Sequence, residues 1–267
     1  MSVLGQNYPN LEYIIIDGGS TDNSVEIIKK YQDKLKYWVS EKDHGMYDAI
    51  QKGFQKSSGD IMAWRNADDL YHRKSFFIVS EIFSKFPIIN WLVGASTFWD
   101  EYGRCIHTHE SRKFSRYDFL MGDFKWLQQE SCFFTKTLWT KAGSYIDKTL
   151  QYAGDFELWL RFFRFEKLYV ANALIGGFRL RSSNQRSLEG MPKYLEEVDA
   201  ILKKEPLSKK DKIKIIRYKV TTSLFTFIQR MFMQRILRKI INKYRRVEFG
   251  NVPSIEFNRN SQGFEIN

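Results

Sequence analysis

The sequence predicts an α/β fold with a mostly parallel sheet flanked by helices. Short apolar runs rich in β-branched residues alternate with amphipathic stretches of helical period early in the chain, which is the pattern of repeated strand–helix units. The chain has 267 residues, of which 43% are hydrophobic, enough to bury a sizeable core. We therefore expect one large domain over residues 1–202, a basic amphipathic helical segment over 203–246 and a flexible tail over 247–267.

Three strand–helix units make up the first part of the predicted domain. The expected strands are apolar runs that end in polar turns, at residues 11–16, 36–40 and 60–65. The expected helices follow these strands, at residues 21–34, 46–56 and 73–86. Ser20 is the predicted cap of the first helix, because its hydroxyl can accept a hydrogen bond from a free N–H of the first turn.

The rest of the chain contains aromatic strands, one strong amphipathic helix and a long basic region. Further strands are expected at residues 91–98, 131–135 and 169–181. The stretch from Gly154 to Phe165 predicts a helix with Asp155 at its start, where the helix dipole favours a carboxylate. Residues 211–246 are expected to form one or two long helices.

Carboxylates follow the predicted strands. Asp17 comes directly after the first strand, Asp43 lies three residues beyond the second, and Asp68 and Asp69 follow the third. Ligands of parallel α/β sheets bind beyond the carboxyl ends of the strands, so we expect these side chains to meet at one edge. The sequence therefore predicts an acidic binding site at this edge of the sheet.

The Asn66-Ala67-Asp68-Asp69 stretch has two possible explanations. Paired carboxylates after a strand can hold a hard divalent cation such as Mg²⁺ or Mn²⁺, which neutralises the charge of a departing diphosphate. The same residues also suit a turn in which an aspartate caps the next helix. Asp17 and Asp43 could likewise accept hydrogen bonds from a nucleoside, or could belong to plain turns beside glycines.

Asp155 is the candidate general base. A carboxylate can take the proton of an acceptor hydroxyl and so make that hydroxyl a nucleophile. A helix start also attracts aspartate for purely local electrostatic reasons, so the position of Asp155 alone leaves both explanations open.

Several other chemistries have no support in the sequence. Cys105 and Cys132 are too few for a disulfide framework and form no CxxC pair for zinc. There is no GxGxxG, P-loop, HExxH or GxSxG motif. The net charge is +11, but residues 203–246 hold 15 Lys and Arg against 2 acidic residues. The main domain is therefore nearly neutral, and nucleic acid is not an expected partner.

Five blocks in the same order resemble family 2 glycosyltransferases. The first contains Asp17-Gly18-Gly19-Ser20-Thr21-Asp22 within residues 2–22. The others lie at residues 40–49, 59–69, 129–134 and 154–161. The resemblance covers about residues 2–187, and the order of the blocks makes it far more specific than any one of them.

The resemblance implies a GT-A fold that binds a nucleotide-diphosphate sugar with Mg²⁺ or Mn²⁺ and transfers the sugar with inversion at the anomeric carbon. By position, Asp17 would contact the nucleoside and Asp43 would lie near it. The block that includes Asn66 looks like a DxD-type motif, with Asp68 or Asp69 on the metal and diphosphate. Asp155 is similar to the family's general base.

The chain departs from the family pattern in two ways. Family members normally have a strand and a loop ahead of the segment at which this chain starts, so an inactive nucleotide-sugar-binding relative or a fragment is an alternative. The QxxRW motif of processive synthases is absent, which favours addition of single sugars. A nucleotidyltransferase, which can share an acidic α/β site, is a further alternative.

The basic segment predicts contact with a membrane surface. In residues 211–246, Lys and Arg lie mainly opposite an apolar helical face, as in helices that rest on anionic membranes. The apolar face consists of Phe225, Phe232, Met233, Ile236, Leu237, Ile240, Ile241 and Tyr244. We expect a cytoplasmic protein, peripheral on the inner face of the membrane, with a glycan or lipid-linked acceptor. The alternative is a helix packed on its own domain or on a second subunit.

Overall fold

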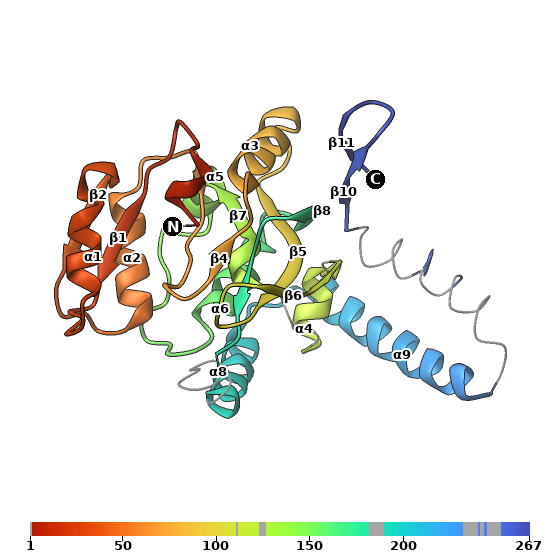
Figure 1. Cartoon of the computed structure of the whole chain (residues 1–267). Helices are drawn as coiled ribbons and strands as arrows, with labels where there is room; N and C mark the ends of the chain where they lie inside the picture. The colour runs from red at the N-terminus through yellow and green to blue at the C-terminus, as the bar shows by residue number, and fades with distance from the viewer. Residues whose placement is uncertain are drawn as a thin grey trace.

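A computed structural model of the chain describes residues 2–110, 112–122, 127–181, 190–231, 240, 243–244 and 252–267 (Figure 1). Helices flank a large central sheet, and a small two-stranded sheet lies to one side of it. The α/β fold class predicted from the sequence is confirmed.

The small sheet consists of two parallel strands. Strand β1 (Ile14–Asp17) pairs with β2 (Tyr37–Ser40). Helix α1 (Ser24–Lys30) lies between them in the chain, and α2 (Met46–Lys56) follows β2 and contacts β1. Every residue of both strands is only half-buried. Parallel strands are normally covered on both faces, so the small sheet is open for its type.

The large sheet contains nine strands within the described residues. Its main path runs β11-β10-β8-β5-β7-β3, and β4, β6 and β9 pair beside this path. The strands are β3 (Ile61–Met62), β4 (Leu70–Tyr71), β5 (Trp91–Trp99), β6 (Cys105–His109), β7 (Cys132–Thr135), β8 (Tyr169–Leu174), β9 (Gly176–Arg179), β10 (Ser254–Asn258) and β11 (Gly263–Ile266).

Pairing in the large sheet is mixed rather than mostly parallel. β5 is parallel to β8 and β9, and β8 is parallel to β10. β7 runs antiparallel to both β5 and β3, and β6 folds back on β5. The connection from β5 to β6 is short, and a short turn joins only antiparallel strands. Among the described strands, β1 pairs only with β2, so the two sheets form separate ladders.

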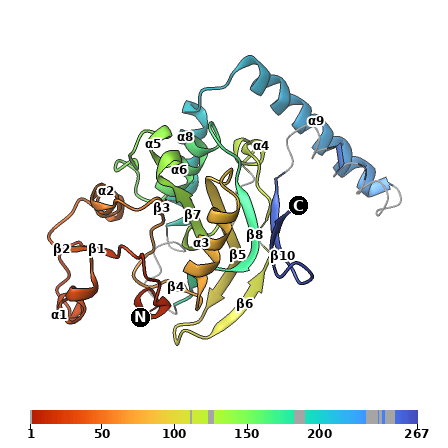
Figure 2. The same ribbon diagram turned by 90° about the horizontal axis from the view of Figure 1, so that it is seen from above.

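Helices cover both faces of the large sheet. Helix α3 (Ser75–Lys85) contributes to one core, and α5 (Lys136–Lys141), α6 (Gly154–Phe162) and α8 (Met191–Lys204) contribute to the other (Figure 2). Adjacent residues of a strand point to opposite faces, so β5 supplies both cores.

The core beneath α6 is rich in aromatic side chains. Trp91 of β5 stacks on Trp159 of α6 with 5.3 Å between ring centroids. Phe134 of β7 lies edge-on to Trp159 at 6.1 Å, and all three side chains are buried. Large rings in such contact contribute both buried area and defined geometry. This core fixes α6, the helix that begins beside Asp155.

The remaining helical elements are α4 (Arg116–Leu120), α9 (Lys209–Met231) and the 3-10 turns η1 (Leu4–Gln6), η2 (Gln32–Lys34) and η3 (Gln129–Ser131). Helix α9 projects from the body of the molecule (Figures 1 and 2). No helix in the described ranges combines the length and apolarity needed to cross a membrane. Of the apolar face predicted for residues 211–246, Ile240 and Tyr244 are exposed, and its other side chains lie outside the described part of the chain.

The first helix begins later than predicted, and Ser20 does not cap it. Helix α1 starts at Ser24, with Asn23 at the cap position. The Ser20 hydroxyl donates to the carboxylate of Asp17 instead, and the Asp22 carboxylate accepts the N–H of Ser24 at 2.9 Å. Ser20 therefore holds Asp17, and Asp22 rather than Ser20 accepts an N–H at the start of the helix.

The expected flexible tail over 247–267 is wrong for the residues that the structure describes there. β10 pairs with the edge of β8, with Ile255 opposite Ala171, and β11 folds back on β10. Ile255 and Phe264 are buried in the core under α3. This stretch is mostly polar, but it contains apolar residues spaced two apart, Ile255 with Phe257 and Phe264 with Ile266. This alternation is sufficient to extend the sheet.

Candidate active site

The loops after β1 and β2 lie in direct contact. Asp17 ends β1, and Asp43 lies in the loop between β2 and α2, where it accepts the N–H of Gly45 at 2.9 Å. A Cβ atom added to Gly18 would come within 2.5 Å of Asp43 Oδ2. A side chain at position 18 would therefore displace the carboxylate of Asp43, and the two carboxylates predicted for the nucleoside lie on neighbouring loops.

Asp17 is held as a charged carboxylate. Its Oδ2 atom accepts hydrogen bonds from the N–H of Ser20 at 3.0 Å and from the hydroxyl of Ser40 at 2.6 Å. Partial burial raises the pKa of Asp17, but the hydrogen bonds outweigh burial and leave the pKa below its ordinary value. Asp17 therefore organises its own loop as well as lining the site.

The two aspartates of the loop between β3 and β4 have opposite surroundings. Asp68 is half-buried and forms an ion pair with Arg181, with 2.8 Å between Oδ2 and Nη2. Asp69 is 1% exposed, and its Oδ1 atom accepts the N–H of Arg179 at 3.0 Å. The carbonyl of Asn66 accepts the N–H of Asp69 at 3.3 Å and closes the turn. The loop thus leaves Asp68 accessible and keeps Asp69 inside.

Glu130 of η3 interacts with Asp69 in the interior. Burial raises the pKa of Glu130 well above its ordinary value, and the charge of Asp69 raises it further. Burial also raises the pKa of Asp69, to about 6. Two interacting buried carboxyl groups are costly to ionise together, so their interaction favours the protonated form of Glu130. Asp69 Oδ2 is buried and accepts no hydrogen bond from the described residues.

Asp68 suits a divalent cation better than Asp69 does. No group of three or more His, Cys, Asp or Glu in the described ranges is arranged to hold a metal by itself. Mg²⁺, however, is often bound by one or two carboxylates together with substrate phosphates, so one accessible aspartate fits a metal that arrives with a nucleotide diphosphate. Asp68 and Asp69 both stay predicted metal ligands, and Asp69 in addition holds the loop through the N–H of Arg179. Asn66 stays a predicted contact of the donor.

Asp155 lies at the start of α6, beside Tyr47 of α2. The Tyr47 hydroxyl donates to the carbonyl of Tyr152 at 2.8 Å and is also a hydrogen-bond partner of Asp155. A Cβ atom on Gly154 would come within 2.7 Å of the Tyr47 ring, so glycine permits this approach. Because the loop of Asp43 leads directly into α2, this helix connects the nucleoside-side loops with Asp155.

The surroundings of Asp155 give it the properties of a base. Burial, the largest cause, raises its pKa from 3.8 to about 6, and the charge of Glu197 on α8 acts in the same direction. Such a carboxylate is ionised at neutral pH and is a better proton acceptor than an ordinary aspartate. Neighbouring Glu157 is engaged elsewhere, because its two oxygens pair with Arg161 at 2.7 and 2.8 Å.

Electrostatic interactions and hydrogen bonds link several of the candidate residues. Charges on Asp69 and Asp155 both raise the pKa of Glu130, so Glu130 is near enough to both carboxylates to interact with them. Tyr47 joins Asp155 to the loops of Asp17 and Asp43.

Three residues of this site were not predicted from the sequence. Tyr47 and Glu130 lie inside two of the blocks that resemble family 2, at residues 40–49 and 129–134, and this was the available signal. Glu197 lies on a helix with no motif, and only the folded structure shows that it reaches the loop before Asp155.

Comparisons with known proteins point to one family of transferases. Residues 1–141 match the family described as glycosyl transferase family 2. The chain is 25% identical over 206 residues to an uncharacterized glycosyltransferase of Rickettsia typhi, which covers 75% of this chain and 64% of that protein. A Haemophilus influenzae uncharacterized glycosyltransferase is 39% identical over 72 residues, 26% of this chain and 29% of that protein. The chain therefore spans less than two thirds of the first relative.

Solved structures of a distant protein share the fold. TarS 1–349 of S. aureus in complex with UDP-GlcNAc superimposes with a TM-score of 0.60 at 14% identity, over 80% of this chain and 64% of that one. TarS 1–349 in a further crystal structure gives a TM-score of 0.59 at 14% identity, over 93% and 74%. These similarities establish the GT-A type of α/β architecture. Because the family match covers more than half of its residues, this chain belongs to glycosyl transferase family 2.

Proposed function

We propose that this protein transfers a sugar from a nucleotide-diphosphate sugar to an acceptor hydroxyl, with inversion at the anomeric carbon. Family membership supports the transferase activity. The contrast between two carboxylates supports the residue roles. Asp155 is a carboxylate with a pKa raised to about 6, and Asp68 is an accessible carboxylate on the loop that Glu130 holds.

Asp155 is the proposed general base. It accepts the proton of the acceptor hydroxyl while the hydroxyl oxygen attacks the anomeric carbon. The bond between that carbon and the diphosphate oxygen breaks, and its electron pair leaves with the nucleoside diphosphate. One displacement on the face opposite the leaving group inverts the anomeric configuration. Fixing Asp155 at the start of a buried helix lowers the entropic cost of reaching this geometry.

Asp68 and Asp69 are assigned to the Mg²⁺ or Mn²⁺ that accompanies the donor, and Asn66 is assigned to the donor itself. Such a cation offsets the negative charge that develops on the leaving diphosphate. Arg181, which pairs with Asp68 at 2.8 Å, orients this carboxylate and adds positive charge to the same region.

Asp17 and Asp43 are assigned to the nucleoside side of the donor. Asp17 holds the loop after β1 through Ser20 and Ser40, and the fit of Gly18 against Asp43 aligns the next loop. We take a uridine diphosphate sugar as the first donor to test, because the TarS structures of similar fold contain UDP and UDP-GlcNAc.

Product identification tests the proposed reaction. The protein is incubated with UDP-, GDP- and dTDP-sugars and with bacterial glycolipids as acceptors, and the products are identified by mass spectrometry. Release of a nucleoside diphosphate together with a new glycosidic bond is expected. Release of pyrophosphate would indicate a nucleotidyltransferase. Nucleotide binding without any turnover would indicate an inactive relative.

We also propose that the basic segment 211–246 rests on an anionic membrane on the cytoplasmic side, near a lipid-linked or glycan acceptor. Ile213, Ile216 and Val220 of α9 are 57%, 60% and 59% exposed, and their spacing places them in one stripe. Buried Asp211 and Tyr218 lie on the opposite side of the helix. The stripe is flanked by exposed Lys209, Lys210, Lys212 and Lys219. Each such lysine contributes about 1 kcal/mol near an anionic surface.

Vesicle sedimentation tests this membrane face. Replacing Ile213, Ile216 and Val220 together with serine should weaken binding to phosphatidylglycerol vesicles about tenfold or more, because the apolar contact is lost. Ile27→Ser, which changes another exposed isoleucine on α1, is the matched control and should bind like the wild type. Equal binding by both variants, or equal wild-type binding to purely zwitterionic vesicles, would rule out this face.

A further inference from the structure

The carboxylate of Glu197 on α8 forms hydrogen bonds with the turn that comes directly before Asp155. Its Oε1 atom accepts the backbone N–H of Gln151 at 2.8 Å. Its Oε2 atom accepts the N–H groups of Tyr152 at 2.9 Å and Ala153 at 2.8 Å. Hydrogen bonds to a charged acceptor are shorter and stronger than neutral ones, and here one carboxylate orders three successive residues.

The turn at residues 151–153 leads into the first turn of α6. The carbonyl of Ala153, at the cap position, accepts the N–H of Glu157 at 3.0 Å. On its other side the turn is held by Tyr47, whose hydroxyl donates to the carbonyl of Tyr152 at 2.8 Å. The backbone of residues 151–153 is thus fixed between α2 and α8, so the direction in which Asp155 leaves the helix is fixed as well.

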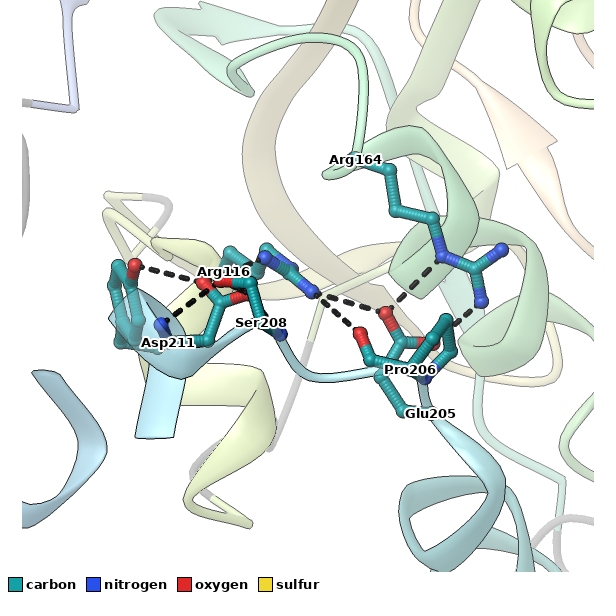
Figure 3. Close-up of polar contacts among 7 residues, drawn as sticks. Arg116, Arg164, Glu205, Pro206, Ser208 and Asp211 are labelled. Carbon is teal, nitrogen blue, oxygen red and sulfur yellow. Dashed lines mark hydrogen bonds and ion pairs between the residues drawn. The ribbon is translucent and has the colours of Figure 1, made fainter. Parts of the chain in front are cut away.

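Helix α8 is itself anchored at its far end. Glu205, the residue that ends α8, accepts hydrogen bonds from Arg164 Nε and Arg116 Nη2, each at 3.1 Å (Figure 3). Arg164 follows α6 directly, and Arg116 also pairs with Asp211 at the start of α9, at 3.0 Å. The side chain of Glu205 is almost fully buried, so this network is rigid by comparison with surface ion pairs. Residues of α8 and its C-terminal cap therefore hold the chain both just before α6, at residues 151–153, and just after it, at Arg164.

We propose that Glu197 is a positioning residue for sugar transfer, holding the turn that presents Asp155 to the acceptor. The proposal rests on the proposed role of Asp155 as general base. Glu197 does not touch the reacting atoms, since its oxygens are engaged with backbone N–H groups. It acts by fixing the backbone and by its negative charge.

The charge of Glu197 gives the proposal a signature that a purely structural role would lack. Among the described residues, the titratable groups that interact with Asp155 are Tyr47 of α2, Glu130 of η3, Cys132 of β7, and Tyr194 and Glu197 of α8. The negative charge of Glu197 raises the pKa of Asp155. Removing that charge should therefore lower the pKa of Asp155 and move the acid limb of the pH–rate profile to lower pH.

Glu197→Gln, compared with Glu196→Gln, tests the proposal. Glutamine has the same shape, but its amide nitrogen cannot accept a hydrogen bond, so at least one N–H of the turn loses its partner. Glu196 is the adjacent exposed residue of α8 and serves as the matched control. At pH 8, where Asp155 is ionised in every variant, Glu197→Gln should lower kcat about tenfold or more and leave donor KM within about twofold. The control should match the wild type.

Two measurements need no turnover and keep this inference separate from the proposed function. ¹³C NMR titration of the Asp155 carboxyl group should give a lower pKa in Glu197→Gln than in the wild type. Hydrogen exchange should show faster exchange of the Tyr152 and Ala153 amides. A folded Glu197→Gln variant with unchanged titration and unchanged exchange would overturn the inference, even if the wild type transfers sugar. A wild type with no transferase activity would instead contradict the proposed function.

Discussion

Carboxylates beside the small sheet and beside the large sheet have pKa values shifted in opposite directions. β1 and β2 are half-buried along their whole length, and Asp17 at their edge has a lowered pKa because hydrogen bonds from serines stabilise its charge. The large sheet has buried strands and an aromatic core, and Asp69, Glu130 and Asp155 at its edge have raised pKa values because burial disfavours their charge.

This difference indicates a division of labour. A carboxylate that stays charged in polar surroundings is suited to binding and to loop structure, as at Asp17. A desolvated carboxylate with a pKa near neutrality is suited to proton transfer, as at Asp155. Asp68 is accessible and paired with Arg181, and such a carboxylate suits a diphosphate and its cation.

The largest effect is expected at Asp155. Asp155→Asn should lower kcat by about 10²- to 10⁴-fold, because asparagine cannot accept the proton. Donor affinity should stay within about twofold of the wild type, since Asp155 is assigned to the acceptor hydroxyl and not to the donor. Initial rates of nucleoside diphosphate release, together with nucleotide titration of the same samples, measure the two effects separately. Loss of both in parallel would mean that Asp155 supports binding rather than chemistry.

Truncation of core residues tests the packing side of the comparison. Trp159→Ala should destabilise the protein by about 3–5 kcal/mol, because Trp159 is buried among Trp91 and Phe134. Ile15→Ala in half-buried β1 should cost only about 1–2 kcal/mol. Urea unfolding followed by tryptophan fluorescence and circular dichroism gives both values. Similar costs for the two variants would mean that the small sheet is packed as densely as the large one.

The raised pKa of Asp155 predicts a gain in stability when its charge is removed. The folded protein holds this proton more tightly than the unfolded chain, so stability falls as pH rises from 3.8 to about 6. Above this window, Asp155→Asn should stabilise the protein by up to about 3 kcal/mol, at about 1.4 kcal/mol per pH unit. Below pH 3.8 the gain should vanish. Thermal unfolding at pH 7.5 and pH 3.5 checks the trend. A variant that is less stable than the wild type at pH 7.5 would contradict a raised pKa for Asp155.

Asp17 should show the opposite dependence on pH, with a smaller amplitude. Its lowered pKa contributes stability above pH 3.8 that is lost as pH falls through the lowered value. Asp17→Asn should therefore destabilise by about 1 kcal/mol at pH 7 and match the wild type at pH 2, a modest effect because the side chain is partly exposed. The same unfolding series measures it. Equal destabilisation at both pH values would show that the negative charge of Asp17 does not contribute to stability.

Much of the fold could be predicted because local signals and the final structure agree. The apolar runs at 11–16 and 36–40 became β1 and β2 with boundaries shifted by at most three residues, and Gly154 begins α6 as expected. The glycines after Asp17 and before Asp155 permit close approaches that only the structure shows.

The rest depended on contacts between distant parts of the chain. The sequence cannot show that Asp69 faces Glu130 while Asp68 stays accessible, because the two aspartates are adjacent and chemically identical. Glu197 lies 44 residues beyond Ala153, to which it bonds, and nothing in the pattern of α8 identifies that partner. The β10–β11 hairpin was missed because two buried residues, Ile255 and Phe264, decide its place.

Titration calorimetry with UDP, GDP and dTDP, each with and without Mn²⁺, tests the central claim that this is a nucleotide-sugar site. The account predicts that one nucleotide binds and that binding depends on Mn²⁺. Asp68→Asn should weaken that binding about tenfold or more, because Asp68 is the accessible carboxylate of the loop. A folded wild-type protein that binds none of the three nucleotides, or that binds one equally well without metal and without Asp68, would contradict it.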